Sequence, residues 1–277
     1  MNQTNERISN LYLTDEYVSN NPSLFKEDSF WKVSKIIPYV DMAVNRISKK
    51  EINLLDVGGG AGSILNAVSE HIEKKYRIKI NKIALDLSPA MLEIQRKENP
   101  DLKKALNESI SYTSLNDKEI DIALMIDVLE HIPNPEDALI ELQRISRYVI
   151  FKVPLENNLC LIIQSLSTKK RVKAAFVTGH TNFYTFGRLK RRIEEHLGNV
   201  IASSFTNVFN YLLQSKGKKG TMTRCYCIIA SLIFKLSPRL CSLLFNDFVM
   251  ILVQNYDLNY EHSGKNRPKF CCGSFKP

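Results

Sequence analysis

The stretch LLDVGGGAGSIL, residues 54–65, decides the fold. It starts with apolar residues around one aspartate, as in a buried strand, and four glycines follow within five positions before a helical pattern begins. Glycine lets the main chain turn sharply and lets a ligand lie directly against it. A strand, a glycine turn and a helix in this order predict a ligand site at the carboxyl edge of a parallel sheet.

Two classes of ligand use such a turn. A dinucleotide site prefers G-x-G-x-x-G, which places a pyrophosphate on the helix N-terminus. Counted from Gly58, the sixth position of this chain is Ser63 rather than glycine. The spacing G-x-G-x-G, at Gly58, Gly60 and Gly62 after Asp56, describes the sequence better.

Apolar runs of strand length alternate with helical patterns between about residues 50 and 155. The strand-like runs are 52–57, 82–87, 121–126 and 148–153, where Pro154 ends the last one, with a weaker run at 110–113. The helical patterns are 62–75, 90–99 and 135–146. Ser88 is expected to cap the second helix, with Pro89 as its first residue. This alternation predicts βαβ units and a parallel sheet.

The later part of the chain contains one more helical pattern, 185–197, and two strand-like runs, 199–205 and 248–254. A long apolar stretch, 211–247, precedes the last run. Lys235 and nearby residues interrupt it, so it lacks the roughly 18–20 apolar residues that a membrane span needs. We expect a helical insertion that packs over the domain, and its composition allows peripheral membrane contact.

These patterns divide the chain into three parts. Residues 1–47 are expected to form an N-terminal helical cap, 48–256 a ligand-binding domain that includes the insertion, and 257–277 a loosely ordered tail. The aromatic and aliphatic residues expected to pack or act as a lid in the cap are Phe25, Phe30, Trp31, Ile36 and Ile37.

Composition describes an ordinary globular chain of 277 residues, with 44% hydrophobic and 24% charged residues. The N-terminus has no apolar core of a secretory signal, and the six cysteines show no zinc or redox spacing. A reduced, cytoplasmic protein is the simple interpretation. The net charge of +9 is concentrated in runs at 169–173, 188–192 and 216–219, which suit either an anionic partner or a solvated surface.

Five ordered segments resemble those of the class I S-adenosylmethionine (SAM)-dependent methyltransferases, over about residues 50–205. LLDVGGGAGSIL resembles motif I of that family, hydrophobic-D-x-G-x-G-x-G. The other four segments are ALDLSPAMLEIQR (84–96), DIALMIDVLEHIPNPEDALIELQRI (121–145), YVIFKVPLENN (148–158) and GHTNFYTFGRLKRRIEE (179–195). The resemblance is to the type 11/12, small-molecule branch. It implies an α/β fold with a Rossmann-like, seven-stranded, mostly parallel sheet sandwiched by helices.

The resemblance also implies where SAM binds. The glycines would admit its amino-acid end, Asp56 would orient the loop or hold the amine, Asp86 would accept hydrogen bonds from the ribose, and Leu87 would pack on the adenine. The full set of implied cofactor residues is Asp56, Gly58, Gly59, Gly60, Gly62, Asp86, Leu87, Met91, Ser114, Leu115 and Asp127. The family's acidic residue at the adenine edge is not evident in SYTSLNDKEID (111–121).

Several of these residues have a structural alternative. Asp56 could cap the following turn, Asp127 could cap the segment that follows it, and Met91 could belong to the core. Asp127 would otherwise lie where the methionine part of SAM meets the substrate. No metal is expected.

Methyl transfer from a sulfonium is an in-line displacement, so the protein mainly positions the nucleophile, and a hydroxyl or amine acceptor usually needs a base. His180 is the strongest candidate base, because it follows the region where this fold builds its acceptor pocket. Asp127, His131 and Tyr184 are the other candidates. Each of the four could equally have a structural role.

The resemblance favours methyl transfer to an oxygen or nitrogen of a small acceptor, such as a saccharide or secondary metabolite, which the basic runs allow to be anionic. The product would be S-adenosyl-L-homocysteine. The amino-methylating nucleic-acid enzymes of this family carry [DN]PP[FY] where this chain has IDVLEHIP, so a nucleic-acid acceptor is disfavoured. RNA or protein methylation is the less favoured expectation. Two alternatives stay open: a same-fold enzyme that uses SAM for a non-methyl reaction, and a non-catalytic SAM-binding module.

Overall fold

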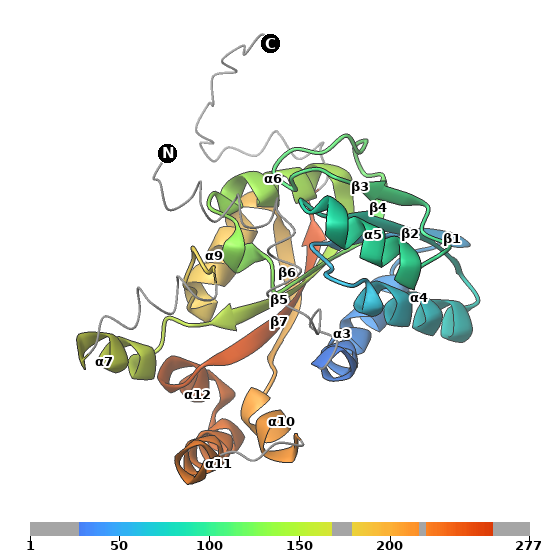
Figure 1. Ribbon diagram of the computed structural model, residues 1–277. Coiled ribbons are helices and arrows are strands. Elements are labelled where there is room, and N and C mark those ends of the chain that lie inside the picture. Colours follow the sequence, from blue (N-terminus) through green and yellow to red (C-terminus); the bar gives the residue numbers. More distant parts are fainter. Residues whose placement is uncertain (1–27, 168–178, 216–219, 257–277) are drawn as a thin grey trace, which may run out of the picture.

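The computed structural model describes residues 28–167, 179–215 and 220–256, and its centre is one seven-stranded sheet (Figure 1). The strand order is β3-β2-β1-β4-β5-β7-β6, and only β7 runs antiparallel to its neighbours. The strands are β1 Glu51–Val57, β2 Lys79–Leu85, β3 Lys104–Leu106, β4 Ile120–Ile126, β5 Ser146–Leu155, β6 Gly198–Phe205 and β7 Asp247–Asn255. The prediction of a seven-stranded, mostly parallel sheet is confirmed.

Helices cover both faces of the sheet, as predicted (Figure 1). Side chains of α3 and α4 pack on one face, and those of α6 and α9 pack on the other. Consecutive strand residues point to opposite faces, so both faces of the central strands are buried. The helices around the sheet are α3 Ser29–Val44, α4 Ser63–Tyr76, α5 Pro89–Glu98, α6 Pro135–Ile145, α7 Leu159–Ser167 and α9 Phe186–His196.

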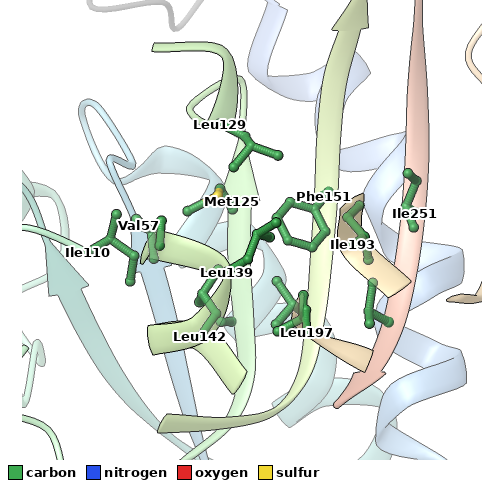
Figure 2. Close-up of a cluster of buried hydrophobic side chains, with 14 of the residues drawn as sticks. Val57, Ile110, Met125, Leu129, Leu139, Leu142, Phe151, Ile193, Leu197 and Ile251 are labelled. Carbon is green, nitrogen blue, oxygen red and sulfur yellow. The ribbon is translucent and has the colours of Figure 1, made fainter. Parts of the chain in front are cut away.

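The α6/α9 face contains the larger cluster of buried apolar side chains (Figure 2). Phe151 lies at its centre, between Met125 of β4 and Ile193 of α9, and all three are 0% exposed. The carboxyl edge, where the predicted ligand site lies, therefore rests on a rigid core.

Local signals set the helix ends that border this edge. Ser88 caps α5 by accepting a hydrogen bond from Met91 N at 3.3 Å, and Pro89 is its first residue, as the sequence predicts. α4 begins after Gly62, whose φ of 81° lies in the left-handed region. Both helices thus start directly after the edge loops of β1 and β2.

Three strand predictions were wrong in position. β2 occupies 79–85 rather than 82–87, because Lys79 and Asn81 interrupt the apolar pattern at its start although these residues pair in register with β1. The third strand is 104–106 rather than 110–113, because a three-residue edge strand is too short to show a pattern. β5 continues through Pro154, which is tolerated because β4 pairing ends at Lys152 and only β7 lies beside it.

The predicted helical insertion consists of α10 Val208–Gln214, α11 Thr221–Leu236 and α12 Pro238–Leu244, between β6 and β7. Its own small core contains Phe209, Cys227 and Cys241. Because β7 begins at Asp247 opposite Leu155, the insertion lies at the carboxyl end of β5 (Figure 1). Within the described ranges, no helix is both long enough and apolar enough to cross a bilayer.

The described part of the predicted cap is α3. Ile36 is buried against the sheet, whereas Phe30 is 88% exposed. Trp31 stacks on Tyr211 of α10 with ring centroids 4.7 Å apart, which ties α3 to the insertion. Phe25, the tail 257–277 and the basic runs 169–173 and 216–219 lie outside the described residues.

Candidate active site

The glycine turn between β1 and α4 adopts φ angles that residues with side chains rarely adopt. Gly58, Gly60 and Gly62 have φ angles of 61°, 56° and 81°. Gly58 N donates a hydrogen bond to Leu85 O at 2.8 Å, which holds the turn against the end of β2. The turn is therefore fixed in a form without side chains of its own at these three positions, although Val128 and Asn99 pack against Gly58 and Gly62. Gly58 is exposed.

Asp56 lies directly beneath this turn. A Cβ built on Gly59 would come 2.0 Å from Asp56 Oδ2, so the loop passes over the carboxyl group with no room for a side chain. Asp56 is 1% exposed, and its Oδ2 has no hydrogen-bond partner among the described residues. Burial, and then the nearby charge of Asp86, raise the pKa of Asp56 to about 7. A buried acceptor without a donor is poised to receive one from the loop or a ligand.

Asp86 directly follows β2 and lies at the same edge. Its Oδ1 accepts a hydrogen bond from Ser88 N at 2.9 Å, which fixes the side chain. Burial raises the pKa of Asp86 to about 6, although backbone N–H groups partly offset it. Leu87 is 40% exposed, and Asn107 Nδ2 donates to the carbonyls of both Asp86 and Leu87. A carboxylate and an apolar surface are thus held side by side.

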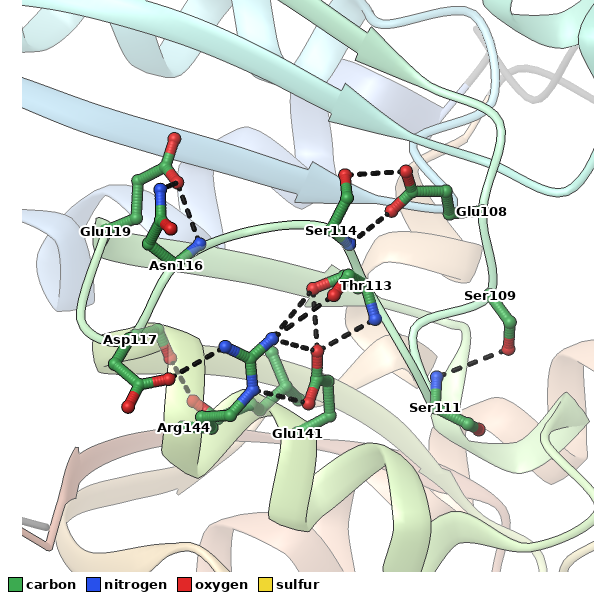
Figure 3. Close-up of polar contacts among 12 residues, drawn as sticks. Glu108, Ser109, Ser111, Thr113, Ser114, Asn116, Asp117, Glu119, Glu141 and Arg144 are labelled. Carbon is green, nitrogen blue, oxygen red and sulfur yellow. Dashed lines mark hydrogen bonds and ion pairs between the residues drawn. The ribbon is translucent and has the colours of Figure 1, made fainter. Parts of the chain in front are cut away.

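The residues expected around the adenine are arranged differently. Met91 and Leu115 are only 1% and 3% exposed, so neither presents a surface. Ser114 N and Oγ both donate to the Glu108 carboxylate, at 2.8 and 2.7 Å (Figure 3). Glu108, two residues past β3, was missed because the third strand was expected at 110–113. Correct placement of that short strand would have drawn attention to Glu108 as an acidic residue just past its end.

A second carboxylate, that of Glu141 in α6, binds the same loop. Thr113 N and Oγ1 donate to Glu141 Oε1 at 2.8 and 2.7 Å, and Arg144 contacts Glu141 and Asp117 (Figure 3). These contacts hold the loop after β3 onto α6. They explain why the run 110–113 forms a loop rather than a strand.

Asp127 follows β4 and has a φ of 57°, which is unusual for a residue with a side chain. Its Oδ1 lies 2.5 Å from Lys152 Nζ and its Oδ2 lies 3.1 Å from Lys32 Nζ. Burial alone would raise the pKa of Asp127, but the two ammonium groups hold it below its usual value. Asp127 is therefore engaged in an ion-paired cluster that links α3, β4 and β5.

Sequence reasoning missed both lysines of this cluster. Lys152 is 1% exposed, and its Nζ lies 3.4 Å from the centroid of the Phe248 ring. A lysine in the middle of the apolar run YVIFKV was the available signal, because such a residue is buried with its strand and needs a partner.

A second polar cluster, the histidine cluster, lies next to Asp127. It contains Glu130 and His131 of the 3₁₀ turn Leu129–His131, and His180 of the loop before α9. Thr181 N and Asn182 N donate to Glu130 O at 2.8 and 3.0 Å, which joins the two segments. One ligand atom of each of the three side chains lies within 4.8 Å of the others, a grouping that could hold a metal ion.

Each imidazole of this cluster has an oxygen beside one ring nitrogen. His180 Nδ1 lies 2.6 Å from Glu156 Oε2, and His131 Nδ1 lies 3.2 Å from Gly179 O. The two rings meet edge to face with centroids 4.7 Å apart. Burial and the neighbouring His180 lower the pKa of His131 to about 4, so it is neutral at pH 7. Burial, and then Asp127, raise the pKa of Glu130 well above its usual value.

The structure thus brings Asp127, His131 and His180 together, and the charge of Glu130 also acts on the Tyr184 hydroxyl. Tyr184 is 3% exposed within the core cluster on the α6/α9 face. Burial raises the pKa of Tyr184 to about 12, so its hydroxyl keeps its proton near neutral pH. Tyr184 packs in this cluster, and its catalytic role stays a prediction.

Comparison with known proteins shows similarity to methyltransferases. Residues 34–196, more than half of the chain, match the family model of a methyltransferase domain. A solved geranyl diphosphate C-methyltransferase from Streptomyces coelicolor A3(2), in complex with Mg²⁺, geranyl diphosphate and S-adenosyl-L-homocysteine, is 11% identical. It has a TM-score of 0.53, with 78% of this chain and 79% of that chain covered.

A second solved structure is phosphoethanolamine N-methyltransferase 2 from Haemonchus contortus, in complex with S-adenosyl-L-methionine. It is 10% identical, with a TM-score of 0.52, and the match covers 79% of this chain and 52% of that chain. At these identities the similarity concerns the fold. No curated protein sequence matches the chain.

Proposed function

Because this chain belongs to the methyltransferase-domain family, we propose that it binds SAM at the carboxyl edge of β1, β2 and β4 and transfers the methyl group to an oxygen or nitrogen of a small-molecule acceptor. The observation that carries the proposal is the bare glycine turn over Asp56 beside the fixed carboxylate of Asp86. A nucleoside with a charged amino-acid tail needs both features.

The chain's own residues would hold the cofactor in three places. The main chain at Gly58 and Gly60 would lie against the amino-acid end, since no Cβ covers it. Asp86 would accept hydrogen bonds from the ribose hydroxyls, and the exposed Leu87 would pack on the adenine. SAM supplies a methyl group on a positively charged sulfur. The carboxylates of Asp56 and Asp86 favour a cation at this edge.

The acceptor side is proposed to be the histidine cluster. The Glu156 carboxylate, 2.6 Å from His180 Nδ1, favours the tautomer with the proton on that nitrogen, so His180 Nε2 can accept one. Asp127 is a positioning residue in this proposal, because its carboxylate is engaged by Lys152 and Lys32. Substrates named for the two neighbours, geranyl diphosphate and phosphoethanolamine, carry phosphate, which is in line with an anionic small acceptor here.

The cofactor proposal is tested by calorimetric titration of SAM into the wild-type chain and into Asp86→Ala. Hydrogen bonds to a charged group are worth about 1.5–3 kcal/mol, so we expect affinity to fall about 10- to 100-fold. Asp137→Ala, an exposed aspartate on α6, is the control and should bind as the wild type does. Equal affinity in Asp86→Ala would contradict the ribose assignment, and no binding by the wild type would contradict the proposed function.

The reaction itself is tested by incubating the protein with methyl-labelled SAM and fractions of a metabolite extract. Mass spectrometry should find one product heavier by a single methyl group, and S-adenosyl-L-homocysteine should accumulate with it. SAM consumed with no methylated product would favour a non-methyl reaction. SAM bound but never consumed in any fraction would favour a non-catalytic module.

We further propose that the outer face of α11 and α12 contacts an anionic membrane surface. Met222, Ile229, Leu232 and Leu236 of α11 are 88%, 52%, 56% and 86% exposed and recur at helical spacing. The sequences of α7, α10, α11 and α12 contain no Asp or Glu, and α11 and α12 carry only basic charges. Apolar residues flanked by cations are the composition of an interfacial helix.

Vesicle sedimentation tests this contact. The wild type should partition onto vesicles that contain anionic lipid, and Leu232→Asp should bind at least about tenfold more weakly, since burying a leucine is worth about 1.5–3 kcal/mol. Ile140→Asp, at a similarly exposed site on α6, is the matched control. Equal sedimentation of the two variants would refute the proposal.

A further inference from the structure

The histidine cluster has features that a single proton acceptor does not explain. It contains a second imidazole and a carboxyl group, Glu130, that is 1% exposed. In the described structure, Glu130 Oε2 has no hydrogen-bond partner. A buried oxygen without a donor is costly unless something else satisfies it. We propose that Glu130, His131 and His180 bind one divalent transition-metal cation of the Zn²⁺ type.

The geometry suits such an ion. The three ligand atoms lie within 4.8 Å of one another, whereas bonds of about 2.0–2.2 Å in a tetrahedral site place ligand atoms roughly 3.4 Å apart. Closing that gap takes side-chain shifts of about 1 Å. The two segments that carry the ligands are already joined through the bonds from Thr181 N and Asn182 N to Glu130 O. The backbone of the two segments is therefore already positioned, and only the ligand side chains need to move.

The partners of the imidazoles point to the same conclusion. Histidines that ligate metals usually present their other ring nitrogen to a carboxylate or a backbone carbonyl. His180 Nδ1 faces Glu156 Oε2 at 2.6 Å, and His131 Nδ1 faces Gly179 O at 3.2 Å. This arrangement assigns Nε2 of each ring to the ion. A carboxylate–histidine pair and a carbonyl–histidine pair thus converge beside one buried carboxyl group.

The other charged groups beside the cluster are already paired with one another. Asp28, Lys32, Asp127 and Lys152 form a chain of ion pairs in which two carboxylates balance two ammonium groups. The carboxyl groups of Glu130 and Glu156 then remain, beside two imidazoles. A divalent cation would offset the negative charge that Glu130 carries as a ligand, which removes the cost of burying that charge.

The donor set also selects the kind of ion. Two imidazoles and one carboxylate suit Zn²⁺, Fe²⁺, Ni²⁺ or Cu²⁺ better than Mg²⁺ or Ca²⁺, which prefer oxygen ligands. The sequence predicts no metal, and the fold needs none. The three residues become a site only where the loop before α9 meets the turn after β4.

Three protein ligands leave at least one position for a further group. In a methyltransferase that position suits an acceptor hydroxyl, so the inference narrows the acceptor to one with an oxygen donor. This role rests on the proposed function, whereas binding of the ion does not. With the ion bound, His180 is a ligand and no longer the proton acceptor.

The experiment measures ion binding without cofactor or acceptor. The full chain is stripped with a chelator, dialysed and titrated with Zn²⁺ by calorimetry, and we expect one ion per chain. Glu130→Gln and His180→Asn should abolish high-affinity binding. Glu156→Gln, which keeps all three ligands, should weaken it about 10- to 100-fold. His196→Asn, at the end of α9, is the control and should bind as the wild type does.

Two further measurements keep the outcome decisive. Circular dichroism shows whether each variant is folded, and X-ray absorption at the zinc edge should show two imidazole nitrogens at about 2.0 Å. No uptake of Zn²⁺ by the folded wild type, or equal uptake by Glu130→Gln and His180→Asn, would overturn the inference. SAM titration of the same samples tests the proposed function separately, because the cofactor residues are not ligands of the ion.

Discussion

Replacing Gly59 by alanine tests how the glycine turn is packed. A Cβ at this position would lie 2.0 Å from Oδ2 and 2.4 Å from Cγ of Asp56. Ordinary contacts of a Cβ begin at 3.4 Å, so the carboxyl group would have to retreat by about 1.4 Å. Gly59 is not one of the glycines with a positive φ, so the cost is steric rather than conformational. Asp56 is buried on all sides and has little room to move.

Overpacking of a closed site costs about 1–3 kcal/mol. In a chain of this size each kcal/mol lowers the melting temperature by about 2–4 °C, so Gly59→Ala should melt roughly 2–12 °C below the wild type. Urea unfolding would show the same loss as a lower midpoint at unchanged slope. The control is Gly187→Ala in α9, where an added Cβ meets no atom within 4 Å. It should be neutral or stabilising by about 0.4–1 kcal/mol.

A double-mutant cycle with Asp56→Ala shows whether this clash is the cause. Without the carboxyl group the new methyl group has space, so Gly59→Ala should cost about 1–3 kcal/mol less in the Asp56→Ala background. The same destabilisation in both backgrounds would refute the reasoning, and so would a Gly59→Ala variant as stable as the wild type. The result does not depend on any ligand.

Two further predictions concern buried charges. Because the pKa of Asp56 rises from 3.8 to about 7 on folding, the folded chain binds the proton more tightly. The wild type should therefore lose stability relative to Asp56→Asn as the pH rises from 5 to 8, and a constant difference in urea unfolding would contradict this. Lys152→Met should cost about 3–5 kcal/mol because it strips Asp127 of a buried partner. Lys190→Met, which removes an exposed ion pair on α9, should change the free energy of unfolding by less than about 1 kcal/mol. Equal losses of stability in Lys152→Met and Lys190→Met, measured by thermal unfolding, would contradict this prediction.

The sequence alone determined the parts of this protein that depend on neighbours in the chain. Strand β1, the glycine turn and the start of α4 follow one another, so their pattern predicts both the parallel sheet and the ligand edge. Ser88 and Pro89 predict the start of α5 for the same reason, since a helix cap acts within one turn. Strand β4 was placed within one residue because its sequence is a continuous apolar run, in which every residue except Asp121 is apolar.

Features that depend on partners distant in sequence were decided by the tertiary structure. The three-residue β3 exists because β2 lies beside it, and Glu108 takes its place at the edge only with that strand. His131 and His180 are 49 positions apart, and no pattern in either segment predicts that their rings are in contact. Lys152 and Asp127 are joined because β4 and β5 are adjacent and end at the same edge. Local patterns specify elements, because backbone hydrogen bonds and caps act over a few residues. The contacts between elements, which build the candidate site, arise from packing that the linear pattern does not encode.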